Sequence, residues 1–420
     1  MKTDLHSDLA GSPEAHRAKE LISACVHCGF CNATCPTYQE TSDERDGPRG
    51  RIYLIRQLLE TGKASSKSRV HLDRCLTCRA CETTCPSGVQ YGKIADIGRG
   101  LIEKAPKTRG WWSALARRVI RLVVPFPSRF GVLLRLGRAF APVLPDVVKM
   151  KIPAPQEALA WPASRHARRM LVLRGCVQAS ATPRTNAAAA HVLDHLGISL
   201  TDAPGAGCCG AASHHLSAHD EALGFARRNI DAWWPHVEAG VEAIVMTASG
   251  CGAMVADYGS LLADDPAYAG KARRISELTR DLSDVIRAEG VEKLPRAQKA
   301  LRIAAQCPCT LQHALRQSRG FDDILVAMGV RLTPTPERHL CCGSAGTYSI
   351  LQPELSQRLL ARKLRALMLG APERIATANV GCQLHLATKA EIPVQHWIEI
   401  AFEALQDARR APGAQTETST

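Results

Sequence analysis

The sequence predicts a helical, cysteine-rich N-terminal domain followed by two repeated α/β domains. Two observations predict this organisation. Eight of the 17 cysteines lie before residue 90, in two copies of one spacing. A second set of cysteines recurs at a nearly constant interval later in the chain, among short apolar runs and helical segments. A chain of 420 residues, 45% hydrophobic and 22% charged, is long enough to form such domains.

The N-terminal cysteines follow the spacing Cys-x2-Cys-x2-Cys-x3-Cys-Pro twice. The eight positions are Cys25, Cys28, Cys31, Cys35, Cys75, Cys78, Cys81 and Cys85. Bacterial two-cluster ferredoxins hold two 4Fe-4S clusters with this spacing, and the fourth cysteine of each motif ligates the other cluster. We therefore expect two 4Fe-4S clusters, with Cys85 completing the first and Cys35 the second. Zinc is the alternative, because Cys-x2-Cys pairs also bind zinc, but zinc does not explain the third and fourth cysteines.

The segment between the two motifs predicts that this domain is helical. Apolar residues recur at helical spacing from Arg51 to Glu60, and Gly62 follows as a stop signal. The sequence thus predicts an α-helical ferredoxin domain over residues 1–105. The stretch from Asp46 to Arg51 is typical of a turn into the helix. Its arginines could lie near the cluster charge or form a solvated helix entry.

The charge balance restricts the classes of partner. Lys and Arg number 53 against 40 Asp and Glu, and the resulting net charge of +13 favours an acidic partner or an anionic surface. No recognition-helix pattern is present, so we expect no nucleic-acid partner. No apolar stretch approaches the roughly 18 residues that span a bilayer. Residues 1–20 lack the apolar region of a secretory signal, so we expect a cytoplasmic, reducing location.

Residues 106–165 predict a basic amphipathic linker. Trp111 and Trp112 precede a stretch in which arginines and lysines far outnumber the single acid Asp146, among Leu, Val, Phe and several prolines. Basic amphipathic segments with tryptophan at the edge are typical of membrane-surface contacts. A segment packed on a partner subunit, or a plain interdomain linker, would have a similar composition.

The cysteines of the second half form two sets of four. They are Cys176, Cys208, Cys209 and Cys251, followed by Cys309, Cys341, Cys342 and Cys382. In each set the first and last cysteines end short apolar runs that predict buried strands, and segments between them, such as 187–196, predict helices. Because ligands bind at the carboxyl ends of strands in α/β sheets, we expect two facing Cys-Cys-Gly α/β repeats, each gathering four cysteines. We place these repeats at 166–295 and 296–410, and a disordered tail at 411–420.

The chemistry of the repeat cysteines stays open at this level. Four converging thiolates suit an additional iron-sulfur cluster or zinc, and adjacent cysteines could form a redox disulfide. Buried structural cysteines are the simpler alternative. Nearby histidines could be ligands, proton carriers or hydrogen-bonded structural residues; they are His214, His215, His313 and His385. Cys307 has no counterpart in the first repeat, and we interpret it as a spare thiol.

A glycine pattern from Gly205 to Gly210 satisfies Gly-x-Gly-x-x-Gly, which is typical of dinucleotide sites. The second repeat keeps only Gly343 of this pattern, and Cys208 and Cys209 occupy the positions that a pyrophosphate would approach. We find no P-loop and no other flavin fingerprint. We therefore expect neither flavin nor nucleotide on this chain, and no catalytic residue for substrate oxidation.

The motifs together resemble a known family. Two ferredoxin motifs followed by two Cys-Cys-Gly repeats are similar to the iron-sulfur subunits of membrane-associated flavin dehydrogenases for glycolate, lactate and glycerol 3-phosphate, and to the heterodisulfide reductase B chain. The resemblance is greatest to glycolate oxidase iron-sulfur subunits. It is carried by the segments Ala24–Tyr38, Asp46–Ile55, Asn229–Pro235, Thr247–Gly252, Cys307–His313, Cys341–Tyr348 and His396–Ile400.

The resemblance implies an electron-transfer subunit of a glycolate dehydrogenase or oxidase complex. Separate flavin-binding subunits would oxidise glycolate to glyoxylate, and this chain would pass the electrons toward a quinone-type acceptor at the inner face of the cytoplasmic membrane. The flavin would perform the hydride step, and this chain would supply one-electron carriers. An equivalent subunit for lactate or glycerol 3-phosphate is the alternative within the family.

The sequence departs from the heterodisulfide reductase pattern at two positions. In those relatives each repeat ends in Cys-x-x-Cys, but here the first position of the pair is Ala248 in one repeat and Asn379 in the other. Their non-cubane cluster is therefore in doubt, and the departure favours electron transfer over a catalytic thiol or quinone reductase. A metal-free docking module in the repeats is a third interpretation.

Overall fold

The computed structural model describes residues 1–105, 109–299, 301–317 and 319–410. The N-terminal part is helical, with short 3-10 turns at Ser7–Leu9 and Glu44–Asp46. Its helices are α1 (Pro13–Ser23), α2 (Phe30–Ala33), α3 (Pro36–Thr41), α4 (Pro48–Thr61), α5 (Ser66–Asp73), α6 (Ala80–Thr84) and α7 (Tyr91–Lys104). Helix α4 ends where Gly62 adopts φ 67°, which confirms the predicted stop signal.

Helices α1, α4 and α7 form the core of this part. Helix α4 buries Ile52, Ile55 and Leu59, and α7 buries Ile94 and Ile102, so the apolar stripes of both helices meet. The two helices approach closely at Gly98, where an added Cβ would lie 2.6 Å from the Ile55 side chain. The helical ferredoxin interpretation is confirmed, and this core carries the cysteine motifs on its connecting loops.

The segment after the helical part contains regular helices. These are α8 (Trp111–Val123), α9 (Pro127–Ala139) and α10 (Asp146–Lys149), with a 3-10 turn at Ala141–Val143. The predicted linker is therefore structured for much of its length. None of the helices in the described ranges combines the length and the apolar character needed to cross a bilayer.

Two four-stranded parallel sheets follow. The first comprises β1 (Arg169–Val172), β2 (Ser199–Asp202), β3 (Ile244–Met246) and β4 (Thr279–Asp281), in the order β2-β1-β3-β4. The second comprises β5 (Arg302–Gln306), β6 (Arg331–Leu332), β7 (Arg374–Thr377) and β8 (Val394–His396), in the order β6-β5-β7-β8. The identical strand order confirms the predicted α/β repeat.

Helices cover both sheets, as expected for parallel sheets whose strands are buried on both faces. In the first repeat they are α11 (Gln178–Ala181), α12 (Pro183–His195), α13 (Ala211–His215), α14 (His219–Glu238), α15 (Ser249–Ala256), α16 (Tyr258–Leu261), α17 (Ala269–Leu278) and α18 (Leu282–Glu289). A π-helical turn at Thr310–Ala314 follows β5, and then come α19 (Asp322–Ala327), α20 (Tyr348–Leu351), α21 (Pro353–Met368), α22 (Val380–Ala387) and α23 (Trp397–Arg410).

The two repeats share one hydrophobic core. Helix α23 of the second repeat packs on α12 of the first, where Thr185 donates a 2.6 Å hydrogen bond to Glu399 and the rings of His191 and Phe402 stack. Residues from both sheets belong to one buried cluster that includes Trp397. The repeats therefore form a pair whose relative position is fixed by packing.

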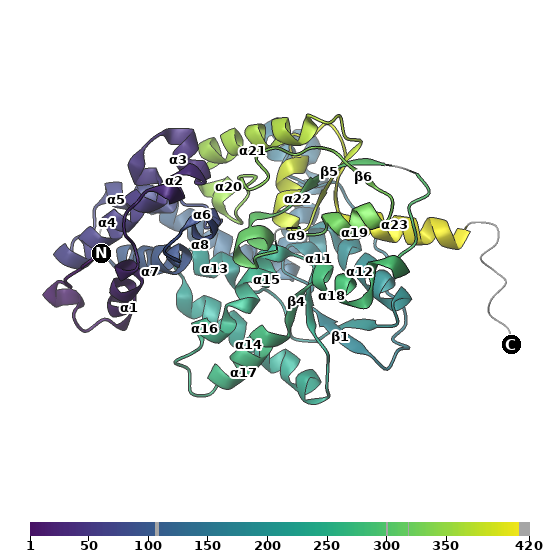
Figure 1. Ribbon diagram of the computed structural model, residues 1–420, viewed down its shortest axis with the longest axis horizontal. Coiled ribbons are helices and arrows are strands. Elements are labelled where there is room, and N and C mark those ends of the chain that lie inside the picture. The colour runs from purple at the N-terminus through teal and green to yellow at the C-terminus, as the bar shows by residue number, and fades with distance from the viewer. Residues whose placement is uncertain (106–108, 300, 318, 411–420) are drawn as a thin grey trace.

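The helical part lies against the paired repeats (Figure 1). Helix α3 contacts α21 of the second repeat, and the Tyr348 hydroxyl donates to the Arg74 carbonyl at 3.1 Å. Arg79 forms a 2.6 Å ion pair with Asp257 of the first repeat. The predicted domain boundaries stay predictions, and the predicted tail 411–420 and linker residues 106–108 lie outside the described residues.

Candidate metal centres

The N-terminal cysteines line two neighbouring cavities. The first cavity is lined by Cys25, Cys28 and Cys31 of the first motif and by Cys85 of the second. Cys85 reaches it because Pro86 directs the chain out of helix α6 toward the first motif. Three cysteines of one loop and the last cysteine of the other loop therefore come together.

The second cavity has the reciprocal composition. It is lined by Cys75, Cys78 and Cys81 of the second motif and by Cys35 of the first. Cys81 also borders the first cavity, so the two cavities share a wall. The structure thus brings together the two sets of four cysteines that crossed ligation requires.

Both motifs use the same backbone path around their cavities. His27 and Thr77, which occupy equivalent positions, have φ values of 61° and 51°, and Gly29 and Arg79 follow with φ 89° and 59°. Positive φ is costly for residues other than glycine, so the surrounding packing must hold these turns in place. The Thr77 N–H donates to the Cys75 sulfur at 3.4 Å. The loops are therefore preformed around the thiols.

Burial and crowding oppose ionisation of these thiols. Burial and the neighbouring thiol of Cys25 raise the pKa of Cys31 to about 11. Burial and nearby Cys309 and Cys35 raise the pKa of Cys78 well above its ordinary value. Four thiolates in one buried cavity are therefore stable only around a cationic centre. The iron of an iron-sulfur cluster supplies such a centre. The donor set and the cavities fit the expected clusters.

Two buried arginines stabilise charge in the second cavity. Arg51 is about 1% exposed, and its guanidinium lies near Cys75 and Cys35. Arg99 donates hydrogen bonds to the Leu72 carbonyl, at 2.8 and 3.1 Å, and to the Cys75 carbonyl at 2.5 Å. Burial alone would raise the pKa of Cys75, but these two guanidiniums lower it below its usual value.

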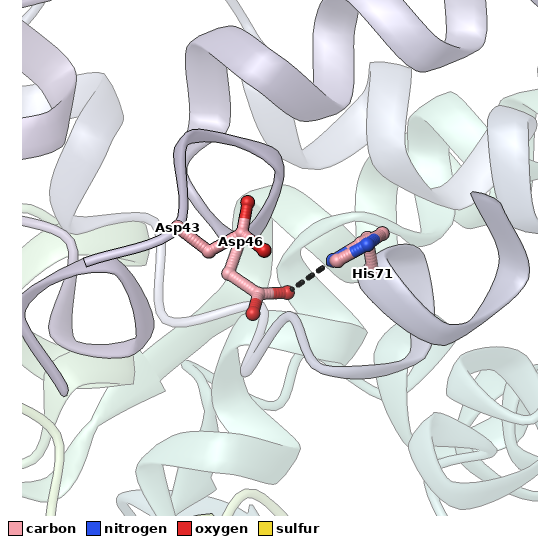
Figure 2. A group of neighbouring side chains, drawn as sticks. All are labelled: Asp43, Asp46 and His71. Atoms are coloured by element: carbon pink, nitrogen blue, oxygen red, sulfur yellow. Dashed lines mark hydrogen bonds and ion pairs between the residues drawn. The ribbon is translucent and has the colours of Figure 1, made fainter. Parts of the chain in front are cut away.

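A buried carboxylate anchors this arrangement (Figure 2). Asp46 accepts hydrogen bonds from the His71 ring and from Arg74, both at 2.8 Å, and its carboxylate lies 3.8 Å from Arg51. The Asp46 carbonyl accepts from Thr37 at 2.8 Å and from the Cys35 thiol at 3.7 Å. Asp46 therefore links the helix entry to the fourth cysteine of the first motif.

Asp43, Asp46 and His71 lie close enough for one metal ion to reach all three. Two guanidiniums already contact the Asp46 carboxylate, and Asp43 pairs with Arg45 at 2.7 Å. A metal cation would have to displace these charges. We therefore interpret the group as a structural ion network that supports the second cavity.

The four cysteines of the second repeat also converge. The sulfur of Cys309 lies 3.8 Å from that of Cys341, and the sulfurs of Cys342 and Cys382 are 3.3 Å apart. Lys363 is buried beside them and donates to the carbonyls of residues 337 and 338, both at 3.2 Å. Burial lowers the pKa of Lys363, while the nearby thiols attract its charge and oppose that shift.

The first repeat gathers its cysteines in the same way. The thiol of Cys176 lies near that of Cys208, and the thiol of Cys209 lies near those of Cys208 and Cys251. Interactions with Cys176 and then Cys209 lower the pKa of Cys208 well below its ordinary value. The same interaction with Cys208 raises the pKa of Cys176. Asn229 fixes the loop by donating to the Cys208 carbonyl at 2.9 Å.

Both Cys-Cys-Gly loops need glycine at the third position. Gly210 and Gly343 have φ values of 90° and 89°. An added Cβ would lie 2.9 Å from the Ala222 carbonyl oxygen in one loop and 2.6 Å from the Ser356 carbonyl oxygen in the other. The glycine therefore lets each loop turn against the following helix and aim both cysteines inward.

The cysteines lie in segments that follow the carboxyl ends of the strands, as expected for an α/β sheet. One detail differs from the prediction. Cys251 and Cys382 do not end strands but lie in the first turns of α15 and α22, which follow β3 and β7. The apolar runs that predicted these strands continue into the helices, so periodicity could not separate the two elements.

The second cavity adjoins the cysteines of the second repeat. Leu76 packs in one buried cluster with Cys341 and Tyr348, and Cys78 and Cys309 border the same cluster. Asn379 then connects the two repeats, because its side chain donates to the Cys382 sulfur at 3.6 Å and accepts from the Gly250 N–H at 3.2 Å. The cysteine groups are therefore contiguous across domain borders.

The candidate histidines mostly have structural partners. His313 bonds Thr83 at 3.0 Å and the His339 carbonyl at 3.1 Å, and His385 bonds Ser356 at 3.1 Å. His214 and His215 lie near Asp96, at 3.4 and 3.9 Å. Cys307 is buried in the shared core and lies in neither cysteine group.

Sequence reasoning missed three polar residues that support the sites, namely Arg99, Asp46 as an anchor, and Lys363. Arg99 and Lys363 lie in helices whose sequence pattern assigns charged residues to solvent. A charged residue within an otherwise apolar stripe is the only local signal that could have identified them. Their partners come from distant segments, so the pairing itself is not visible in the sequence.

Family models match most of the cysteine-bearing chain. A model described as a 4Fe-4S dicluster domain matches residues 21–89. A cysteine-rich domain model matches residues 170–256 and again 303–387. These assignments cover the helical part and both α/β repeats.

Individual proteins and structures are also similar to this chain. The glycolate oxidase iron-sulfur subunit of Escherichia coli is 51% identical, over 97% of this chain and all of that protein. Lactate utilization protein A of an Exiguobacterium species is 24% identical, over 56% of this chain and 96% of that protein. The crystal structure of a hypothetical protein from Helicobacter pylori aligns with a TM-score of 0.54 at 10% identity, over 95% of this chain and 73% of that one. That structure shows likeness of fold alone.

A probable glycolate oxidase iron-sulfur subunit of Bacillus subtilis is 29% identical, over 87% of this chain and 88% of that protein. The two glycolate oxidase relatives thus align with both the helical part and the repeats, whereas the lactate protein aligns with about half of the chain. Together with the dicluster and cysteine-rich domains, this similarity shows that the chain belongs to the family of glycolate oxidase iron-sulfur subunits.

Proposed function

We propose that this chain carries electrons within a glycolate oxidase complex, from flavin-containing partner subunits toward a quinone-type acceptor. The partner subunits oxidise glycolate to glyoxylate, and this chain takes up the electrons one at a time. The observation that carries the proposal is the contiguity of three cysteine groups, from the first cavity through the second cavity to the second repeat. The extent of the glycolate oxidase alignment favours glycolate over lactate as the substrate of the complex.

The ligand assignment is part of the proposal. One 4Fe-4S cluster binds Cys25, Cys28, Cys31 and Cys85, and the other binds Cys75, Cys78, Cys81 and Cys35. The reciprocal lining of the two cavities supports these sets. Further metal centres bind the repeat cysteines, a proposal supported by the short sulfur–sulfur distances of the second repeat and by the nearby Lys363.

Charge distribution gives the electron path a direction. Cys28, which lines the first cavity, is exposed, so an electron donor can approach this site. The second cavity is flanked by the buried cations Arg51 and Arg99. Positive charge near a cluster favours its reduced form and raises its potential. Electrons that enter at the first cavity are therefore drawn toward the second cavity and the adjoining repeat.

The departures from Cys-x-x-Cys support electron transfer over catalysis by the repeats. Ala248 and Asn379 occupy the positions that would supply an additional thiol in each repeat. The Asn379 amide instead hydrogen-bonds the Cys382 sulfur and the α15 backbone. A side chain of this kind stabilises a one-electron centre through a hydrogen bond to sulfur but offers no thiol for disulfide chemistry.

The crossed ligation can be tested with pairs of cysteine variants. The double variant Cys28→Ser/Cys85→Ser removes two ligands of one cavity and should keep one cluster, with about four irons per chain in the ferredoxin motifs. The matched double variant Cys28→Ser/Cys35→Ser damages both cavities and should keep neither. Iron analysis and EPR of reduced protein measure the difference. If the first double variant loses both clusters and the second keeps one, ligation is not crossed.

The role of Arg51 can be tested by a redox titration. Arg51→Gln should lower the midpoint potential of the second-cavity cluster by on the order of 100 mV, because loss of one nearby unit charge at an effective dielectric near 20 changes the interaction energy by about 2 to 3 kcal/mol. Arg56→Gln, in the same helix but paired with Glu60, is the control and should leave the potential unchanged. Equal potentials in the Arg51 variant and the wild type would contradict the proposed direction of transfer.

The place of this chain after the flavin can be tested in the assembled complex. Cys28→Ser or Cys78→Ser should stop electron flow from glycolate to an external acceptor, while glycolate still bleaches the flavin in stopped-flow absorbance. The flavin step does not need the clusters, and the onward step does. Loss of flavin reduction in these variants would show that this chain shapes the substrate site instead.

The metal content of the repeats can be tested by iron analysis of single variants. Cys341→Ser and Cys208→Ser should lower iron per chain while the EPR signals of the two ferredoxin-type clusters persist, because the repeat cysteines lie outside both cavities. Cys307→Ser, a buried thiol outside the cysteine groups, is the control. Unchanged iron in all three variants would favour a metal-free docking role for the repeats.

A further inference from the structure

Helix α8 exposes its apolar face. Trp111 and Trp112 are 63% and 67% exposed, and Leu115, Val119 and Leu122 are about half exposed. These residues recur at helical spacing, so they share one side of the helix. In a helix that packs only on its own protein, this is the side expected to be buried. Helix α8 therefore turns its apolar side away from the rest of the protein, the reverse of the usual orientation.

Polar contacts hold α8 in this orientation. On the opposite side Arg117 forms a 3.0 Å ion pair with Asp73 of α5, and Arg121 lies 3.3 Å from Glu221 of α14. Ile120 is the one apolar residue of α8 that is buried. The helix thus attaches to two domains by its charged side, and its apolar side faces outward.

Helix α9 repeats this arrangement. Its exposed residues Val132, Leu133, Leu136 and Phe140 share helical spacing. On the inner side Leu134 is buried, and Gly131 lies against Ser180 of α11. After α9 the apolar exposure continues at Val143, Val148 and Met150. We call the exposed apolar residues of α8, α9 and this following stretch the outward apolar surface.

Exposed cations accompany the outward apolar surface. Arg118, Arg135, Lys149 and Lys151 are exposed and form no ion pair with another described residue. Asp146 is the single acid between Trp111 and Lys151. The surface therefore combines tryptophan, aliphatic side chains and unpaired positive charge, with almost no negative charge to offset it.

We propose that the outward apolar surface binds the interface of an anionic lipid membrane. Amphipathic helices with tryptophan and leucine on one side and arginine nearby lie in the headgroup region, where apolar burial and attraction to anionic lipid add. The charge complementarity selects anionic lipid, and aromatic rings at the helix end match the position tryptophan prefers at that boundary. The inference deepens the proposed function, since a quinone acceptor lies in the same membrane, but the surface itself does not depend on electron transfer.

Vesicle co-sedimentation of the purified full chain tests the proposal. The chain should bind vesicles of phosphatidylglycerol and phosphatidylethanolamine, bind vesicles of phosphatidylcholine much less, and lose affinity as salt rises. Arg118→Gln/Arg135→Gln should weaken binding roughly 30-fold, since each cation near an anionic surface contributes about fivefold. Trp112→Ser/Leu133→Ser should weaken binding further and remove the blue shift of tryptophan fluorescence that vesicles cause.

Matched control variants test whether binding depends on this surface or is weakened by the loss of any exposed cation or apolar residue. Arg17→Gln/Arg331→Gln removes two exposed cations from α1 and β6, and Leu369→Ser removes an apolar residue that is 70% exposed after α21. Both controls should bind like the wild type. Iron content and dye reduction by the complex should stay normal in every variant, which separates a failure here from a failure of the electron-transfer proposal.

Two outcomes overturn the proposal. In the first, the wild-type chain does not sediment with anionic vesicles, or the surface variants and the controls lose binding equally. In the second, the surface variants keep vesicle binding but no longer assemble with the flavin-containing subunits in size-exclusion chromatography, which would assign the outward apolar surface to a protein interface.

Discussion

Negative charge on buried thiolates has to be balanced, and this requirement explains the buried cations around the cysteine groups. Burial and neighbouring thiols oppose ionisation and raise the pKa of Cys78, so each group of thiolates must face a cationic centre or a buried cation. Arg51 and Arg99 serve the second cavity, and Lys363 lies beside the second repeat. These cations are buried in turn only because carbonyls and Asp46 satisfy them.

The paired α/β repeats gather cysteines that lie far apart in the chain. Parallel strands bring the segments that follow them to one edge of the sheet, so each repeat can collect four cysteines from three such segments. The shared core then fixes the two collections relative to each other, and Tyr348 and Leu76 connect one of them to the helical part. Packing thereby determines which cysteine groups lie next to one another.

The segment between the helical part and the repeats serves a different purpose. Helices α8 and α9 attach to the protein through ion pairs, a glycine and the buried residues Ile120 and Leu134, and they leave most of their apolar residues outward, although burial of those residues would stabilise the isolated chain. This orientation leaves the apolar sides of both helices available for contact outside the chain.

Local periodicity and counting were enough to identify the cysteine motifs, the internal repeat and the helical stripe from Arg51 to Glu60, which lies within the observed helix Pro48–Thr61. The sequence also indicated the two sets expected from crossed ligation. The residues that support each site from distant segments could be identified only from the folded protein. Arg99 and Lys363 read as solvent-facing in sequence, yet packing from other segments buries them beside sulfur, and the direction in which α8 turns its apolar side likewise depends on ion pairs with Asp73 and Glu221. Such pairings join residues far apart in the chain, so local pattern cannot specify them.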